Sequence, residues 1–245
     1  LAQLLYFVVN HVRDPSGAFG VDGPALSVPD AVRSEAPSLA DACDQLAAQA
    51  GISLPAGSSA AGEQPKFLLR QPDGTRWIVK FSPPRGTPFG ERWHALLHLE
   101  KLALDVLQGH GVACADTRMV ETATRTFLLS RRFDRSALYG HRHLVAAAAV
   151  HDHFVRAPRQ HWVGTCRALL GQALLSPQGV DTAAQAFLFG QFIGNTDMHF
   201  GNLSFFVDNV ARPRFEVAPI YDMLPMMWRP SIHSGSLDVD PLRQP

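Results

Sequence analysis

The sequence predicts an α+β fold with two lobes, the first rich in β-strands and the second mainly helical. Two observations support this prediction. Short segments rich in β-branched and aromatic residues are concentrated between residues 66 and 131, with one long helical segment among them. From residue 144 onward, longer segments with helical spacing of apolar residues dominate. The chain has 245 residues, which is enough for one large domain or two small ones.

The composition is that of an ordinary globular protein. Hydrophobic residues make up 46% and charged residues 18%, and the formal net charge is +0. With a net charge of zero, the chain has no overall electrostatic field that would favour binding to nucleic acid or to a membrane surface. Since no segment approaches about 18 uncharged apolar residues, we expect no transmembrane helix, and the first residues do not predict a signal peptide. Three cysteines without a Cys-x-x-Cys pair are typical of a cytoplasmic protein.

The N-terminal part carries no motif that indicates a function. Residues 1–57 are predicted to form a helical and linker region of no assigned role, with helices over 1–20 and 39–50. Around these helices the sequence is rich in Ala, Ser, Pro and Gly, which is typical of loops.

Residues 58–135 are predicted to form the β-rich first lobe. Pro72-Asp73-Gly74 predicts a turn, because Pro fixes φ, Asp bonds its own backbone and Gly accepts positive φ. A helix is expected over 91–108, since Gly109 and Gly111 follow it. Four strands are expected, at 67–70, 76–81, 117–121 and 126–131.

Residues 136–245 are predicted to form the helical second lobe. Apolar residues recur there at helical spacing, and a last hairpin turns at Asp208-Asn209. The expected elements are helices at 144–155, 163–175 and 181–193, followed by strands at 203–207 and 214–218.

The most informative segment, residues 194–202, follows a predicted helix and precedes a predicted strand. It contains Asp197 and, five residues on, Asn202, and Asp222 follows after 20 more residues. Phosphoryl transfer from ATP needs a carboxylate that accepts the proton of the attacking hydroxyl, and oxygen ligands that hold Mg²⁺. Protein kinases place these groups on an Asp-x-x-x-x-Asn loop, a hairpin and a further Asp. The alternative is that all three are only turn or capping residues.

A lysine and a glutamate of the first lobe are predicted to pair. Lys80 ends an apolar strand, which is where a kinase places the ammonium group that contacts ATP phosphates. Glu100 lies on the apolar stripe of helix 91–108, four residues after Leu96 and three after Leu97. A carboxylate that faces the core is costly unless it is paired, and Lys80 is the expected partner. Alternatively, Glu100 reaches water at the edge of the stripe.

Two other groups of residues give weaker signals. Small side chains in residues 58–66 would let backbone N–H groups approach phosphate oxygens. The segment matches neither common glycine-rich motif, so a plain loop is the alternative. Histidines at 141, 143, 151 and 153 lack the spacing of a metal site, and we expect them to be solvated or locally bonded.

Together these segments resemble the HipA family, the bacterial serine/threonine kinases of toxin–antitoxin systems. The resemblance covers roughly residues 58–230. It implies a two-lobed protein-kinase-like fold that binds ATP and Mg²⁺. The motifs that carry it are Gly62-Glu63-Gln64-Pro65-Lys66, Ile78-Val79-Lys80, Arg132-Phe133-Asp134-Arg135, Phe192-Ile193-Gly194-Asn195-Thr196-Asp197-Met198-His199-Phe200-Gly201-Asn202 and Pro219-Ile220-Tyr221-Asp222.

The resemblance implies a role for each matching residue. Asp197 would be the catalytic base, and Asn202 and Asp222 would ligate Mg²⁺. Lys80 would contact the ATP phosphates, with Glu100 as its partner.

The other implied positions surround the nucleotide. Arg131 and Phe133 would lie at the hinge beside adenine, and His199 would support the catalytic loop and approach the phosphates. Tyr221 would border the nucleotide, and Ser59 would be the serine whose autophosphorylation ejects the phosphate-covering loop and inactivates the kinase. The residues of that loop assigned to nucleotide binding are Ala61, Gly62, Glu63, Gln64 and Lys66.

The implied function is transfer of the ATP γ-phosphate to a protein hydroxyl, on a tRNA synthetase or translation factor. The implied partners are an antitoxin protein and, through it, DNA. Three departures from the family are visible. Residues 1–55 do not match the usual N-terminal subdomain, and Arg131 replaces an acidic residue often found at the hinge. The chain ends 23 residues after Asp222, where family members continue, so a truncated second lobe is expected.

Two other functions are compatible with parts of this pattern. A small-molecule phosphotransferase of the aminoglycoside kinase type also uses an Asp-x-x-x-x-Asn loop. It would transfer phosphate to a small alcohol rather than to a protein. A non-catalytic pseudokinase that bridges an antitoxin or DNA complex would lack a catalytic group, whereas Lys80, Asp197, Asn202 and Asp222 are all present.

Overall fold

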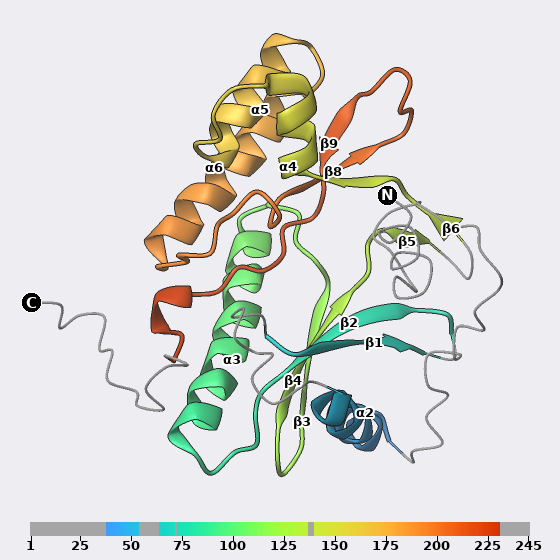
Figure 1. Cartoon of the computed structure of the whole chain (residues 1–245), viewed down its shortest axis with the longest axis vertical. Helices are drawn as coiled ribbons and strands as arrows, with labels where there is room; N and C mark the ends of the chain where they lie inside the picture. The colour runs from blue at the N-terminus through green and yellow to red at the C-terminus, as the bar shows by residue number, and fades with distance from the viewer. Residues whose placement is uncertain (1–37, 54–63, 72, 137–139, 231–245) are drawn as a thin grey trace, which may run out of the picture.

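The computed structural model of the chain describes residues 38–53, 64–71, 73–136 and 140–230. It confirms the predicted two-lobed α+β fold (Figure 1). The first lobe contains a four-stranded antiparallel sheet of order β1-β2-β4-β3. Its strands are β1 (Lys66–Arg70), β2 (Arg76–Phe81), β3 (Thr117–Glu121) and β4 (Thr126–Arg131).

The two faces of this sheet have different partners. Trp77, Val79 and Phe81 alternate along β2 and are buried against α2 (Leu39–Ser53), which contributes Cys43 to the same core. Ile78 and Lys80 point to the opposite face, as the two-residue period of a strand requires. Hydrophobic burial therefore fixes which face of β2 presents Lys80.

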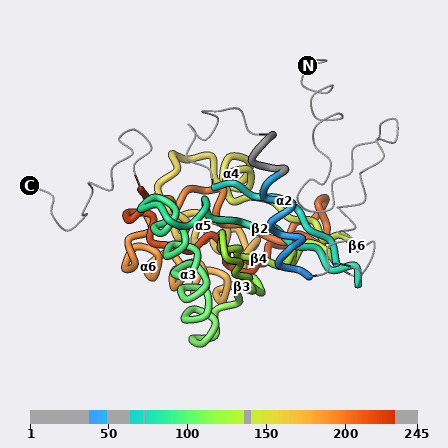
Figure 2. Tube along the Cα trace, turned by 90° about the horizontal axis from the view of Figure 1, so that it is seen from below, coloured from blue at the N-terminus to red at the C-terminus, as the bar shows by residue number. Residues whose placement is uncertain are grey.

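Helix α3 (Pro88–Gly109) connects the two lobes. It begins with Thr87, whose hydroxyl accepts a hydrogen bond from Gly90 N at 3.0 Å, and with proline in its first turn. Its first half packs Trp93 and Leu96 against the segment after residue 222, and its second half contributes to the core of the second lobe. Figures 1 and 2 show this helix beside both the sheet and the second lobe.

The second lobe is mainly helical but begins with a strand. Residues 144–155 were expected to form one helix, and this expectation is wrong at its start. The first three residues form β7 (Leu144–Ala146), which pairs with β8 in antiparallel register. The local sequence could not show this, because the partner strand lies about 60 residues further along the chain. The elements that follow are α4 (Ala147–Val150), a π-helical turn (His151–Val155), α5 (Trp162–Gly171), α6 (Pro177–Phe192), β8 (Ser204–Val207), β9 (Phe215–Val217) and a 3₁₀ turn (Met226–Trp228).

A backbone connection joins the lobes just before residue 222. Ile220 N donates to Ala113 O at 2.8 Å, and Ala115 N donates to Ile220 O at 2.9 Å. Cys114 and Ile220 thereby form an isolated parallel bridge. This connection anchors the segment that carries Asp222 to the end of α3 and to β3.

Two smaller findings complete the fold. A short hairpin of β5 (Arg135–Ser136) and β6 (Gly140–His141) was not predicted. None of the helices in the described ranges is long and apolar enough to cross a membrane. The helix expected over 1–20 lies outside the described residues, and the limits of 1–57, 58–135 and 136–245 stay predictions.

Candidate active site

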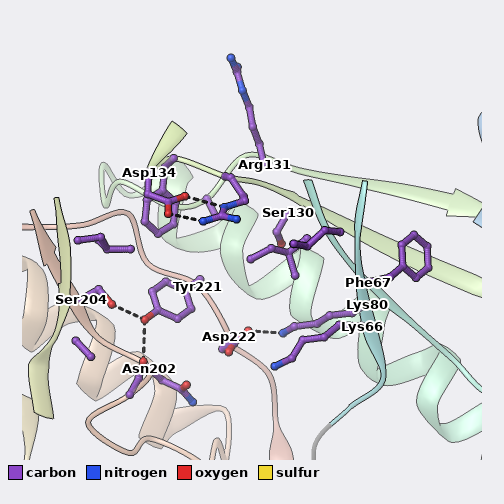
Figure 3. A pocket seen from close by; sticks show the side chains of 18 residues that line it. Lys66, Phe67, Lys80, Ser130, Arg131, Asp134, Asn202, Ser204, Tyr221 and Asp222 are labelled. Atoms are coloured by element: carbon purple, nitrogen blue, oxygen red, sulfur yellow. Dashed lines mark hydrogen bonds and ion pairs between the residues drawn. The ribbon is translucent and has the colours of Figure 1, made fainter. Parts of the chain in front are cut away.

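A cavity of about 580 Å³ lies between the sheet of the first lobe and the β7–β8 region of the second (Figure 3). Its volume is in the range of small-molecule and cofactor sites. Both lobes supply polar side chains to it. Seven of the predicted site residues line the cavity, namely Lys66, Lys80, Arg131, Phe133, Asn202, Tyr221 and Asp222.

The ion pair predicted between Lys80 and Glu100 is present. Lys80 Nζ lies 2.6 Å from Glu100 Oε1 and also pairs with Asp222 Oδ1. Lys66 and Lys80 are register partners on β1 and β2, and both side chains extend toward Asp222 (Figure 3). The Glu100 side chain is only 1% exposed. Lys80 thus links Glu100 on α3 to Asp222, which follows the backbone connection at Ile220.

The charges of this trio are coupled. Burial by itself lowers the pKa of Lys80, but Asp222 and Glu100 outweigh it, so the pKa lies above the ordinary lysine value. Burial raises the pKa of Glu100, and Lys80 opposes this shift only in part. Burial also acts to raise the pKa of Asp222, but the charge of Lys80 and its hydrogen bond lower it overall. Lys80 is therefore cationic and Asp222 anionic near neutral pH.

The loop with Asp197 and Asn202 is held by its own side chains. Asn195 Oδ1 accepts from Asp197 N at 3.1 Å, and Asn202 Nδ2 donates to Asp197 O at 2.8 Å. Trp162 Nε1 donates to His199 O at 3.1 Å. The first two bonds use the backbone of Asp197 and leave its carboxylate free of them, and the Asp197 side chain is 52% exposed.

Asp222 is fixed in an unusual backbone conformation. Its φ is 54°, in the left-handed region that residues other than glycine rarely adopt. Asn195 Nδ2 donates to its carbonyl oxygen at 3.2 Å. Because such conformations persist only where the surroundings hold them, they are concentrated at functional sites. Asn195 thus connects the positions of Asp197 and Asp222.

Tyr221 closes the second-lobe side of the cavity. Its hydroxyl donates to Gly201 O at 2.8 Å and lies 2.7 Å from Ser204 Oγ. Burial raises the pKa of Tyr221 to about 12, so it stays a neutral donor. Its ring lies 5.9 Å from that of Phe133, between centroids. Together these contacts join Phe133 to the loop of residues 194–202.

Arg131 lines the cavity but is exposed, and its side chain points away from the other labelled residues (Figure 3). The next residues carry a buried ion pair. Arg132 Nε and Nη2 donate to Asp134 at 3.0 and 2.7 Å, and Arg135 Nη1 donates to the same carboxylate at 2.8 Å. The Arg-Phe-Asp-Arg motif thus forms a buried charge cluster, with Phe133 between Arg132 and Asp134 in the sequence.

Several predicted site residues do not line the cavity. Gln64, Glu100, Asp197 and His199 are described but lie outside its lining. His199 Nδ1 accepts a hydrogen bond from Gly201 N at 2.9 Å, and its Nε2 is 4.0 Å from Asp197 Oδ1; its role at the phosphates stays a prediction. Ser59, Ala61, Gly62 and Glu63 lie outside the described residues.

Asn195 lies in the segment that the sequence marked as most informative but was given no role, and Ser204 was not singled out. Asn195 stands two residues before Asp197, which is the spacing of a turn closed by an Asn side chain, so this signal could have been used. Ser204 gave no signal, because its partner Tyr221 lies 17 residues away on another segment.

The residues at the cavity fit a hard divalent cation. Asp222 supplies a carboxylate, and because the amide nitrogen of Asn202 is bonded to Asp197 O, its amide oxygen is the atom left for a ligand. Such oxygen donors suit Mg²⁺. On the facing sheet, Lys66 and Lys80 supply positive charge of the kind that suits phosphate groups.

Helix α6 packs at Gly190 against Met198, in the loop of residues 194–202. We expect Gly190→Ala to lower the free energy of unfolding by about 1–3 kcal/mol, because the added methyl group overfills this contact. A Cβ at this position would lie 2.4 Å from Met198 Sδ and 3.2 Å from Met223 Sδ. Urea denaturation measures the loss. Gly109→Ala is the matched control, since a Cβ there meets nothing within 4 Å. Equal stabilities of the two variants would contradict the packing argument.

Comparison with known proteins gives consistent matches. The model of the HipA-like C-terminal domain matches residues 58–241. Toxin YjjJ of Escherichia coli (strain K12) is 37% identical over 192 residues, which cover 77% of this chain and 42% of that protein. The solved Shewanella oneidensis MR-1 HipA, in complex with HipB and operator DNA, matches with a TM-score of 0.62 and 20% identity, over 92% of this chain and 57% of that chain. A more distant match is the Helicobacter pylori proinflammatory kinase CtkA, with a TM-score of 0.46, 18% identity and coverages of 65% and 55%. The chain thus spans about half the length of these relatives.

Proposed function

Because this chain belongs to the HipA-like C-terminal domain family, we propose that it transfers the γ-phosphate of ATP to a serine or threonine hydroxyl of a protein. The observation that supports this most is the convergence of Lys80 from the first lobe with Asn202 and Asp222 from the second at one cavity. These groups suit phosphate and Mg²⁺, and the adjacent Asp197 carboxylate suits a proton acceptor.

Each residue would have a separate part in the reaction. Lys80, held by Glu100, would bind phosphate oxygens. Asn202 and Asp222 would hold Mg²⁺, which when bound neutralises charge on the phosphates. Asp197 would orient the substrate hydroxyl and accept its proton at a carboxylate oxygen. The hydroxyl oxygen would then bond to the γ-phosphorus as the bond to the β-phosphate oxygen breaks, giving phosphoprotein and ADP.

The biological setting is proposed from the relatives. One is named a toxin, and another was solved with HipB and its operator DNA. We therefore propose a toxin kinase that acts on a tRNA synthetase or translation factor in the cytoplasm. It would be bound by an antitoxin and, through it, DNA, and it would be inactivated by autophosphorylation at Ser59. The three cysteines are free, which is compatible with a reducing compartment.

We expect Asp197→Asn to lower the rate of ATP- and Mg²⁺-dependent phosphorylation about 100-fold or more, because the amide cannot accept the hydroxyl proton. Mass spectrometry would locate phosphate on Ser59 or on an added protein. Asp208→Asn, at an exposed position of the β8–β9 hairpin, is the matched control and should keep the wild-type rate. Equal rates for Asp197→Asn and wild type would contradict the proposed base. ATP binding without phosphate transfer by the wild-type chain would favour the pseudokinase alternative.

A further inference from the structure

Three potential metal ligands meet where α3 packs against β3, at a site that is not part of the cavity. They are His94 and His98 on α3 and Glu121 at the end of β3, and their ligand atoms all lie within 4.8 Å of one another. His98 Nε2 is already 3.1 Å from Glu121 Oε1, and the two imidazole rings are 4.6 Å apart between centroids. None of the three lines the cavity between the lobes.

The fold holds these side chains in place. His94 and His98 are four residues apart on one helix, so they lie one above the other on the same face. Two histidines at this spacing are a common pair of metal ligands. Contacts with β3 and β4 place α3 beside the sheet (Figure 1), and Glu121 is the last residue of β3. His94 Nδ1 also contacts Thr126 Oγ1 on β4, and this contact holds the imidazole ring in place.

The cluster already surrounds a cation. Arg85 Nη2 lies 2.8 Å from Glu121 Oε2, 3.1 Å from His94 Nδ1 and 3.3 Å from Thr126 Oγ1. The guanidinium therefore contacts two of the three potential ligands. Because the Arg85 side chain is partly exposed, it has room to turn outward. The acceptor atoms of His94, Glu121 and Thr126 thus already hold a positive charge, that of the Arg85 guanidinium.

The ligand set indicates which ion would fit. Two imidazoles and one carboxylate suit Zn²⁺ and neighbouring first-row ions, whereas Mg²⁺ and Ca²⁺ prefer oxygen ligands alone. His98 and Glu121 are accessible to solvent, so water can complete a four-coordinate site. We infer that His94, His98 and Glu121 bind one divalent transition-metal ion of the Zn²⁺ class, and that the Arg85 guanidinium gives way when the ion binds.

Such an ion would tie α3 to the sheet. Glu100, the partner of Lys80, lies two residues after His98 on the same helix. An ion shared by α3 and β3 would restrict movement of that helix relative to the sheet. Binding of the ion does not depend on phosphoryl transfer, so the site can be tested whether or not the chain is a kinase.

Calorimetric titration of the whole chain with Zn²⁺, in excess Mg²⁺ to saturate oxygen sites, tests the inference. We expect one ion per chain, with affinity reduced about 100-fold or more in His94→Ala and in His98→Ala. His110→Ala, exposed at the end of the same helix, is the matched control and should bind as the wild type does. No binding by the wild type, or undiminished binding by both His94→Ala and His98→Ala, would overturn the site.

A second variant tests the exchange with the arginine. Arg85→Ala removes the competing cation and should tighten Zn²⁺ binding by about tenfold, which corresponds to roughly 1.4 kcal/mol. Unchanged or weaker affinity would overturn the exchange. Thermal unfolding provides an independent readout, since Zn²⁺ should raise the melting temperature of the wild type but not of His98→Ala. Melting without the ion verifies that each variant is folded.

Discussion

Replacing Lys80 by methionine is expected to lower the free energy of unfolding by about 3–5 kcal/mol and to abolish ATP-dependent phosphorylation. The stability falls because Glu100 is buried, and its second carboxylate oxygen has no hydrogen-bond partner within the described part of the chain. Without Lys80 this charge is uncompensated. Lys101→Met is the matched control, because its exposed pair with Asp105 should contribute less than about 1 kcal/mol.

The loss of stability and the loss of activity can be separated. Lys80→Met combined with Glu100→Gln removes both charges at similar volume, so we expect most of the stability to return while the activity stays absent. Urea denaturation and a phosphorylation assay on the two variants measure these quantities. If the double variant is as unstable as Lys80→Met, the uncompensated Glu100 carboxylate is not the cause of the lost stability.

The same single variant should have an altered pH dependence. Burial raises the pKa of Glu100, and Lys80 opposes this, so removing Lys80 raises the pKa further. A carboxyl group with a raised pKa binds protons more tightly in the folded state than in the unfolded state. The stability of Lys80→Met should therefore increase, relative to the double variant, as the pH falls from neutral toward the ordinary pKa of a glutamate side chain. If the free energies of unfolding of Lys80→Met and of the double variant change equally with pH, this explanation is contradicted.

Replacing Asp134 by asparagine is expected to lower the free energy of unfolding by about 3–5 kcal/mol as well. Its carboxylate accepts hydrogen bonds from Arg132 and Arg135 at 2.7–3.0 Å, and all three side chains are almost fully buried. The amide preserves the shape but leaves two buried guanidinium groups without their carboxylate.

Thermal and urea unfolding would measure the effect of Asp134→Asn. The matched control is Asp152→Asn, which breaks an exposed pair with Arg159 and should cost no more than about 1 kcal/mol. A similar small loss for both would show that the hinge pair does not stabilise the fold.

Several elements of the fold could be predicted from the sequence because their signals are local. The strands at 76–81, 117–121 and 126–131 were predicted with the bounds that the structure has, since residue type and neighbouring turns mark them. The pairing of Lys80 with Glu100 was also predictable, because a carboxylate on an apolar helical stripe needs a partner. The kinase-like fold was implied by the resemblance to the HipA family, which rests in part on the segment that carries Asp197 and Asn202 and on the one that ends at Asp222.

The tertiary structure decided what depends on contacts between distant segments. Residues 144–146 form a strand instead of a helix because β8 supplies their hydrogen bonds. The contact of Lys80 with Asp222 spans 142 residues, and the cluster of His94, His98 and Glu121 joins a helix to a strand. Periodicity and propensity describe neighbours along the chain, whereas these arrangements are set by long-range packing and backbone pairing. Local signals thus specified most of the elements and all of the chemical groups, whereas long-range pairing decided residues 144–146 and packing decided which groups meet.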